Sequence, residues 1–291
     1  MIKLIVDSTC DINNLITDKY DIEVIPLNIV IDEVSYLDGV DIKTQTVYEN
    51  MKAGKVPKTS QVSFESVTKA FDKCVLNNDD FIYLAFSSKM SGTYHFAKNI
   101  LNVYKEKYPE RKMEIIDSKG GAGGAGLIAI QALKMIEKKL PFETIIKQIR
   151  FMVDHLDYYF TISDLKWLSK GGRIAKSLGY VGSALSIKPY LTVVDGRIVF
   201  SKMIHGSKRM LNTLIRDVQA GTREFKKQII GISHADDIDT ALKVEEKIKD
   251  TIEGCKTTIF QIGAVLGSHL GIGGVGVFFL NEEPEFYELQ Y

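Results

Sequence analysis

The chain has 291 residues, of which 45% are hydrophobic and 25% are charged, as expected for a globular protein with a sizeable core. Its 37 Lys and Arg balance 37 Asp and Glu, so no net charge favours binding to nucleic acid or to an anionic membrane. No apolar run approaches the roughly 18 residues that a membrane span needs, and residues 1–7 form a strand pattern rather than a signal peptide, which predicts a cytoplasmic protein.

Strand and helix patterns alternate through the first half of the chain. Short apolar runs predict strands at residues 3–6, 81–86 and 113–116, with one or two more at 22–31. Helical spacing of apolar residues predicts helices at 45–51, 64–76, 127–138 and 144–156, another directly after residue 93, and a loop at 57–61. This alternation favours an α/β fold, in which helices cover both faces of a mostly parallel sheet and ligands gather at the carboxyl ends of its strands.

The pattern changes near residue 158. Asp195 and Gly196 separate two β-rich runs at 190–194 and 197–200, which predicts a hairpin with a type I′ turn. Further strands are predicted at 158–162, 229–233, 257–262 and 275–280, with helices at 210–218 and up to about 252. We therefore predict two domains, a three-layer α/β/α domain at residues 1–160 and an α+β domain at residues 161–291.

The turn after the predicted strand at 81–86 is rich in small polar residues. Ser87, Ser88, Ser91, Gly92 and Thr93 lie between this strand and the helix that follows. A helix N-terminus offers unpaired N–H groups and the positive end of the helix dipole, which suit a carboxylate or a phosphate. Ser91 either caps this helix or turns its hydroxyl toward a ligand, and a capped helix with nothing bound is the simpler interpretation of this turn alone.

Residues 121–126 match the glycine pattern GxGxxG, so a dinucleotide site is an alternative. Residues 117–120 separate these glycines from the preceding strand, although the dinucleotide motif needs the turn at once. No second strand ending in an acidic residue follows about 20 residues later, and the GK[ST] ending of a phosphate-binding loop is missing. Close packing of the backbone is the favoured interpretation.

His269 lies between glycines in a segment, 267–274, that we expect to be a flexible loop. Ser91 with His269 suggests a serine esterase or acyltransferase, but the GxSxG motif is absent and no acidic partner is evident. Asp11, after the first strand, is interpreted as a helix cap instead of a nucleophile. These residues indicate binding more clearly than bond breaking.

Metal and redox chemistry have little support in the sequence. Cys10, Cys74 and Cys255 are few, odd in number and far apart, so they form neither a disulfide framework nor a CxxC site. The five histidines share no metal-ligand spacing. No metal and no cofactor are expected.

Several short segments, taken in order, resemble the DegV family over nearly the whole chain. They are DSTCD at 7–11, PKTSQ at 57–61, SSKMSGTY at 87–94, KGGRI at 170–174, KPYL at 188–191 with DG at 195–196, and GSHLG at 267–271. The resemblance implies a two-domain lipid-binding protein that holds one long-chain fatty acid, such as palmitate, stearate or oleate, between its domains. It also implies that the protein is no enzyme and presents the carboxylate to a separate fatty acid kinase.

The resemblance assigns roles to particular residues. Thr59, Ser60 and Ser91 are expected to donate hydroxyl hydrogen bonds to the carboxylate, together with the N–H groups of Gly92 and Thr93. The neutral His269 approaches the same head group from the second domain. The acyl chain is expected in an apolar tunnel, where burial contributes about 0.8 kcal/mol per methylene.

Basic residues downstream are candidate contacts for the kinase. The family often has Arg where this chain has His205, and it commonly carries fewer glycines at 120–126, which suggests a cavity of altered size in this chain. The candidate partner contacts are Lys170, Arg173, His205, Lys208 and Arg209.

Overall fold

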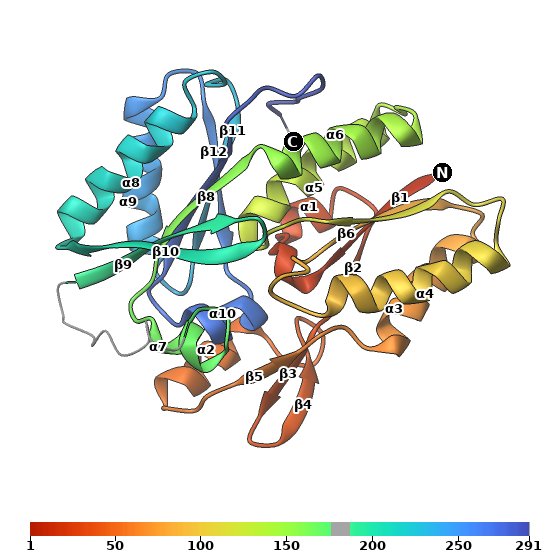
Figure 1. Cartoon of the computed structure of the whole chain (residues 1–291), viewed down its shortest axis with the longest axis horizontal. Helices are drawn as coiled ribbons and strands as arrows, with labels where there is room; N and C mark the ends of the chain where they lie inside the picture. Colours follow the sequence, from red (N-terminus) through yellow and green to blue (C-terminus); the bar gives the residue numbers. More distant parts are fainter. Residues whose placement is uncertain (176–186, 291) are drawn as a thin grey trace.

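Three sheets organise the residues that the computed structural model describes, which are 1–175 and 187–290 (Figure 1). The first sheet has four parallel strands in the order β2-β1-β6-β7. Its strands are β1 (Ile2–Asp7), β2 (Ile22–Ile25), β6 (Asp80–Ala85) and β7 (Met113–Asp117). The mostly parallel sheet that the alternating pattern predicts is therefore present.

Side chains alternate across this sheet, and each face is covered by its own pair of helices. Ile5 and Tyr83 pack against α3 (Phe64–Leu76) and α4 (Thr93–Lys107). Leu4 and Leu84 point to the other face, against α5 (Ala122–Glu137) and α6 (Phe142–Asp154). This period of two residues buries both faces of the central strands β1 and β6 and confirms the three-layer α/β/α arrangement.

The second sheet has six strands in the order β10-β9-β8-β13-β11-β12 and is mixed. Its strands are β8 (Leu156–Thr161), β9 (Ile187–Val194), β10 (Arg197–His205), β11 (Ile229–His234), β12 (Lys256–Gln261) and β13 (Val275–Leu280). Only β11 and β12 pair in parallel among the described pairs. Helices α8 (Ser207–Gly221) and α9 (Ile238–Thr251) cover one face. Asp195 and Gly196 have φ of 47° and 78°, so the predicted β9–β10 hairpin and its type I′ turn are confirmed.

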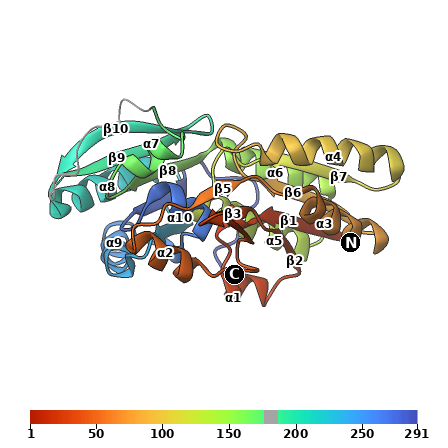
Figure 2. The ribbon, with the colours of Figure 1, turned by 90° about the horizontal axis from the view of Figure 1, so that it is seen from below.

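A small antiparallel sheet, β4-β3-β5, lies beside the junction of the two large sheets (Figure 2). It consists of β3 (Asn28–Ile31), β4 (Val34–Leu37) and β5 (Lys58–Ser60), and α2 (Thr44–Lys52) connects its last two strands. The predicted loop at 57–61 is therefore wrong in its centre, because residues 58–60 pair with β3. A three-residue strand is too short to show a period of two in the sequence.

Short helices complete the described chain. They are the 3₁₀ turn η1 (Ser8–Cys10), α1 (Asn14–Thr17), α7 (Lys166–Lys170) and α10 (Ala264–Leu270). The expectation that 267–274 forms a flexible loop is wrong for its first half, because residues 267–270 belong to α10. Flanking glycines hid this helix in the sequence, since glycine disfavours a helix interior.

Helix α5 is shared by the two large sheets, because it contacts β1 on one side and β11, β12 and β13 on the other. It begins at Ala122, five residues before the predicted start, so the glycine pattern lies within its first turns. A Cβ atom on Gly123 would overlap the Phe260 ring and lie 2.7 Å from the Ser233 Oγ. The glycines thus serve close packing of α5 against its neighbours.

The predicted boundary at residue 161 stays a prediction. Strand β8, which ends at Thr161, is hydrogen bonded to β9 and β13 in the six-stranded sheet. Contacts across this predicted boundary are numerous, because β8 pairs with β9 and β13, α5 contacts β11, and α10 contacts α2 and β3.

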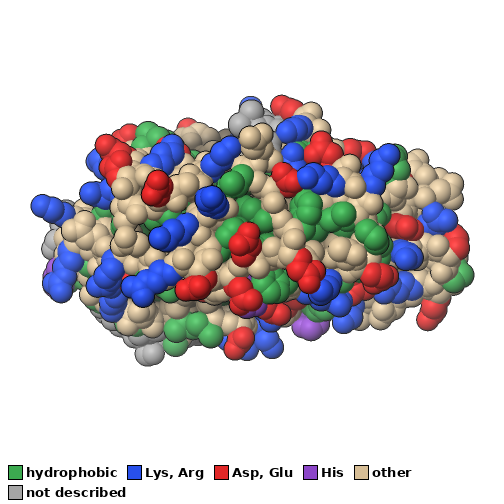
Figure 3. All heavy atoms as spheres, turned by 90° about the horizontal axis from the view of Figure 1, so that it is seen from above, with side chains coloured by type: hydrophobic (Ala, Val, Ile, Leu, Met, Phe, Trp, Pro, Cys, Tyr) green, Lys and Arg blue, Asp and Glu red, His purple; other side chains and the backbone are tan. Residues whose placement is uncertain are grey.

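The surface carries both signs of charge. Figure 3 shows Lys and Arg side chains interspersed with Asp and Glu on the face seen from above, without a continuous field of either sign. Within residues 1–175 and 187–290, no helix combines the length and the apolar character needed to cross a membrane.

Replacement of Gly123 by Ala tests the packing of α5 against the second sheet. The added methyl group overlaps the Phe260 ring, so we expect Gly123→Ala to lower the free energy of unfolding by about 1–3 kcal/mol, measured by urea denaturation. Glu137→Ala on the exposed side of the same helix is the control, with an expected change below about 0.5 kcal/mol. A Gly123→Ala protein at least as stable as wild type would mean that helix propensity outweighs the overlap.

Candidate functional site

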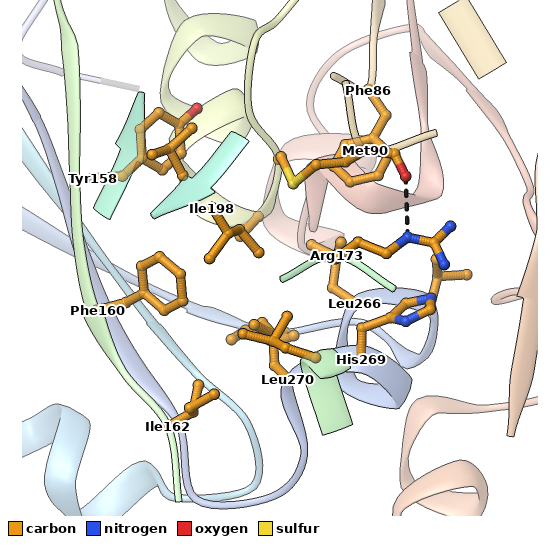
Figure 4. A pocket seen from close by; sticks show the side chains of 18 of the residues that line it. Phe86, Met90, Tyr158, Phe160, Ile162, Arg173, Ile198, Leu266, His269 and Leu270 are labelled. Atoms are coloured by element: carbon orange, nitrogen blue, oxygen red, sulfur yellow. Dashed lines mark hydrogen bonds between the residues drawn. The ribbon is translucent and has the colours of Figure 1, made fainter. Parts of the chain in front are cut away.

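A pocket opens where α10, the small sheet and the two large sheets meet (Figure 4). It encloses about 880 Å³ of empty space, a volume that includes its open mouth. Its lining comes from β5, the turn before α4, the start of α5, strands β8, β9, β10 and β13, the α7 region and α10. Ligands of α/β sheets commonly bind at the carboxyl ends of parallel strands, and the turns after β6 and β7 lie at this end of the four-stranded sheet.

One wall of the pocket is apolar and comes largely from β8. Tyr158, Phe160 and Ile162 lie two residues apart, so all three face the cavity. Tyr159 between them faces away and stacks with Tyr190 at 6.0 Å. Tyr158 and Phe160 therefore belong to the pocket wall, whereas Tyr159 belongs to the core under α8.

Polar groups gather at the opposite side of the pocket. Thr59 and Ser60 come from β5, Ser91 from the turn before α4, Arg173 from the segment after α7, and His269 from α10. Four parts of the chain that lie far apart in sequence thus converge on one side of the cavity. Figure 4 shows Arg173 and His269 across the cavity from Tyr158 and Phe160.

His269 is bonded to Thr59, because the Thr59 Oγ1 and the His269 Nε2 lie 2.6 Å apart. Burial, with a smaller contribution from the charge of Arg173, lowers the pKa of His269 to about 4. The imidazole is therefore neutral at physiological pH. When Nε2 carries the proton it donates to Thr59, which leaves the Thr59 hydroxyl free to donate to a ligand.

Two buried contacts hold the start of α10, and hence His269, in place. The Tyr48 hydroxyl donates to the Ile262 carbonyl at 2.8 Å, and the Asp11 Oδ1 accepts from the Gly263 N–H at 2.9 Å. The sequence interpretation of Asp11 as a cap of the helix that follows it is wrong, because the Asn13 Oδ1 accepts the Ile16 N–H at the start of that helix. The Asp11 carboxylate instead supports a helix more than 250 residues away. Burial raises the pKa of this carboxyl well above its ordinary value.

Arg173 lies in the pocket wall. Its Nε donates to the Met90 carbonyl at 3.1 Å, and its guanidinium also donates to the Gly171 carbonyl. Burial lowers the pKa of this guanidinium, which nevertheless keeps its charge at physiological pH. The sequence interpretation placed Arg173 only among partner contacts and so missed the cation of the pocket, because a single Arg in a Gly-rich segment carries no periodic signal.

Ser91 both lines the pocket and supports the helix that follows it. Its Oγ accepts the Thr93 N–H at 3.2 Å and lies 3.0 Å from the Thr93 Oγ1. Gly92 is exposed and Thr93 is buried, and neither lines the pocket. Gln61, to which the sequence interpretation gave no role, lines the pocket, and its Oε1 lies where a Cβ atom of Gly92 would be.

The remaining candidate residues lie elsewhere. His205, Lys208 and Arg209 are exposed at the end of β10 and the start of α8, and they do not line the pocket. The other end of the β9–β10 hairpin meets the polar turn, because the Ser87 Oγ donates to the Gly196 carbonyl at 2.7 Å. His205, Lys208 and Arg209 therefore lie at the opposite end of this hairpin from the pocket, whereas Arg173 lines the pocket.

The geometry offers little to a serine hydrolase. The Ser91 hydroxyl is bonded to Thr93, whereas His269 is bonded to Thr59. Among the described residues, His269 Nδ1 has no hydrogen-bond partner, so no carboxylate orients the ring. An imidazole with a pKa of about 4 is also a weak general base at neutral pH.

Known proteins resemble this chain over its length. The model of the family described as "Uncharacterised protein, DegV family" matches residues 1–282. A DegV domain-containing protein of Clostridium perfringens is 32% identical over 282 residues, which cover 96% of this chain and 97% of that protein. The structure of a DegV lipid-binding protein of Thermotoga maritima shares 28% identity and a TM-score of 0.84, covering 97% of this chain and 99% of that one. A stearic-acid-binding protein of Eubacterium ventriosum shares 26% identity and a TM-score of 0.87, covering 96% and 97%.

Titration of His269 tests the electrostatics of the pocket. We expect NMR to give a pKa of about 4 for this ring in the ligand-free protein. The unfolded chain, with a pKa near 6.5, binds more protons between pH 4 and 6.5, so His269 lowers stability as the pH falls through this window. His269→Gln should remove this contribution in urea denaturation at several pH values.

The matched variant for the titration is Arg173→Gln. Loss of the neighbouring charge should raise the pKa of His269, while burial keeps it below 6.5. A wild-type pKa at or above 6.5 would contradict the buried, neutral imidazole described above.

Proposed function

The chain belongs to the DegV family, and on this premise we propose that it binds one long-chain fatty acid in the pocket described above. The observation that carries the proposal is the division of the pocket into an apolar wall and a single polar side. A fatty acid has the same division. Proteins of the same fold from Thermotoga maritima and Eubacterium ventriosum are described as binding lipid and stearic acid, which supports the proposal.

The proposed head-group contacts combine neutral donors with one charge. The hydroxyls of Thr59, Ser60 and Ser91 donate to the carboxylate, and the neutral His269 orients the Thr59 hydroxyl. The guanidinium of Arg173 adds a charge-assisted interaction, which is stronger than a neutral hydrogen bond. The positive end of the α4 dipole adds a further favourable contribution, and the N–H groups of Gly92 and Thr93 stay predicted donors.

The acyl chain supplies most of the binding free energy in this proposal. At about 0.8 kcal/mol per methylene, a sixteen-carbon chain contributes roughly 10 kcal/mol before the costs of ordering. Tyr158, Phe160, Ile162 and Ile198 offer the apolar surface that such a chain needs. Palmitate, stearate and oleate are the proposed ligands, and no cofactor takes part.

A partner follows from the family resemblance. We propose that the protein presents the carboxylate to a separate fatty acid kinase in the cytoplasm and does not itself catalyse a reaction. Lys170, His205, Lys208 and Arg209 stay the predicted contacts, and their exposed positions are compatible with this role. The half-buried Arg173 joins the head-group contacts in this proposal and lies beside the carboxylate that a kinase must reach.

The alternative, a serine esterase or acyltransferase, has weaker support. The only contact in the pocket region between a described hydroxyl and an imidazole is that of Thr59 with His269. This pair lacks an orienting acid among residues 1–175 and 187–290. Its low imidazole pKa leaves little driving force for proton abstraction.

Head-group variants test the proposed binding. Loss of one neutral hydrogen bond costs about 0.5–1.5 kcal/mol, so Ser91→Ala and Thr59→Val should each weaken binding of palmitate to the delipidated protein by about 2- to 10-fold. Arg173→Gln should weaken it more, because a charged donor is lost. Displacement of a fluorescent fatty acid measures all three dissociation constants.

Ser88→Ala is the matched control, since Ser88 lies in the same turn but does not line the pocket. It should bind palmitate like wild type. Equal affinities for all four variants would overturn the assigned head-group site. Hydrolysis of an acyl ester that disappears in Ser91→Ala or Thr59→Val would favour the esterase instead.

A further inference from the structure

The ring of Tyr158 packs directly against the backbone of two glycines, Gly120 and Gly124. A Cβ atom on Gly120 would overlap the Tyr158 hydroxyl, and one on Gly124 would lie 2.5 Å from the ring Cε1. Real Cβ atoms do not approach so closely, so any side chain at either position displaces the ring. The Tyr158 ring therefore packs directly against the backbone of Gly120 and Gly124, on the side of the ring away from the pocket.

The backbone of Gly124 cannot move further away from the pocket. Helix α5, which carries Gly124, packs against both large sheets. A Cβ atom on Gly126 would be 3.1 Å from the Cys10 carbonyl oxygen, on the side of the four-stranded sheet, and the Phe260 ring limits Gly123 on the other side. The position of the Tyr158 ring is thus fixed from behind by close packing of α5 against its neighbours.

Tyr158 closes the row of side chains that forms the apolar wall. The row runs from Ile162, directly after β8, through Phe160 to Tyr158 on that strand. Phe278 of β13 meets the Tyr158 ring edge to face at 5.2 Å. The side chain of Tyr158 is only 6% exposed. Figure 4 shows it across the cavity from His269 and Arg173, at the side remote from the polar groups.

We propose that the Tyr158 ring, seated on Gly120 and Gly124, is the stop that limits the length of the acyl chain. This inference rests on the proposed fatty acid binding and adds a specificity-determining residue to it. The glycines at 120–126, of which the family commonly has fewer, do not widen the cavity. The Tyr158 ring occupies the space that the missing side chains of Gly120 and Gly124 leave. Removal of the ring opens the pocket toward α5 and admits longer chains.

The ring and not the hydroxyl acts as the stop. Within the described part of the chain the Tyr158 hydroxyl makes no well-formed hydrogen bond, and its one backbone interaction is with Gly121. Removal of a hydroxyl with so weak a contact costs little, so Tyr158→Phe is expected to fold normally. This variant keeps the ring and separates steric from polar effects.

The test measures dissociation constants of the delipidated protein for saturated acids from dodecanoic to eicosanoic acid. A methylene without room in an apolar pocket is rejected by roughly 10-fold or more. Tyr158→Ala should therefore raise the affinity for eicosanoic relative to hexadecanoic acid by about 10-fold or more. Tyr158→Phe should keep the wild-type order of affinities.

Two further variants add a methyl group at Gly124, against which the Tyr158 ring packs. Gly124→Ala pushes the ring into the pocket, so its preferred acid should be shorter than that of wild type. The double variant Gly124→Ala with Tyr158→Ala should again accept longer acids, because its methyl group no longer meets a ring. Tyr159→Ala is the control on the same strand, and its preference should be unchanged because Tyr159 faces the other side of the sheet.

The outcomes separate this inference from the proposed function. A wild-type protein that binds none of the acids refutes the proposed function. If wild type binds them and Tyr158→Ala shows the same length preference, fatty acid binding stands and the stop is refuted. A changed length preference in Tyr158→Phe would also overturn the proposal, because the hydroxyl would then contact the ligand.

Discussion

The close approach of α5 to both large sheets is the constraint on which the site depends. Gly123 and Gly126 allow this approach, because Phe260 and the Cys10 carbonyl lie where their side chains would be. Helix α5 lies between the two large sheets (Figure 1). The pocket opens beside the start of this helix, and α10 and the small sheet contribute to its lining. A helix with larger side chains at these positions would separate the sheets and change the pocket.

The polar side of the pocket depends on contacts between distant parts of the chain. Thr59 and His269 are 210 positions apart and share one hydrogen bond, while Asp11 and Tyr48 fix the start of the helix that carries His269. Among the described lining residues, the neutral imidazole of His269 leaves Arg173 as the one positive charge at this side. A pocket whose described lining combines this cation with several hydroxyls and a long apolar wall suits a ligand with one anionic end, which is the physical basis of the proposed fatty acid binding.

Local signals predict much of the fold. Asp195-Gly196 predicts the hairpin because only a few residue pairs adopt two successive positive φ angles, and the apolar run at 81–86 predicts a buried strand. The start of α5 and the helix of His269 escape prediction because glycine in a helix is explained only by tertiary packing, as Gly124 and Tyr158 show. The family motifs predict that Thr59, Ser91 and His269 lie near one another, but the position of Arg173 in the pocket depends on contacts that no local pattern records.

The most direct test of fatty acid binding is mass spectrometry of the freshly purified protein, first under native and then under denaturing conditions. Binding predicts a native mass that exceeds the chain by one long-chain fatty acid, and loss of this adduct when the pocket unfolds. A native mass equal to that of the bare chain, unchanged after incubation with palmitate or oleate, would contradict it.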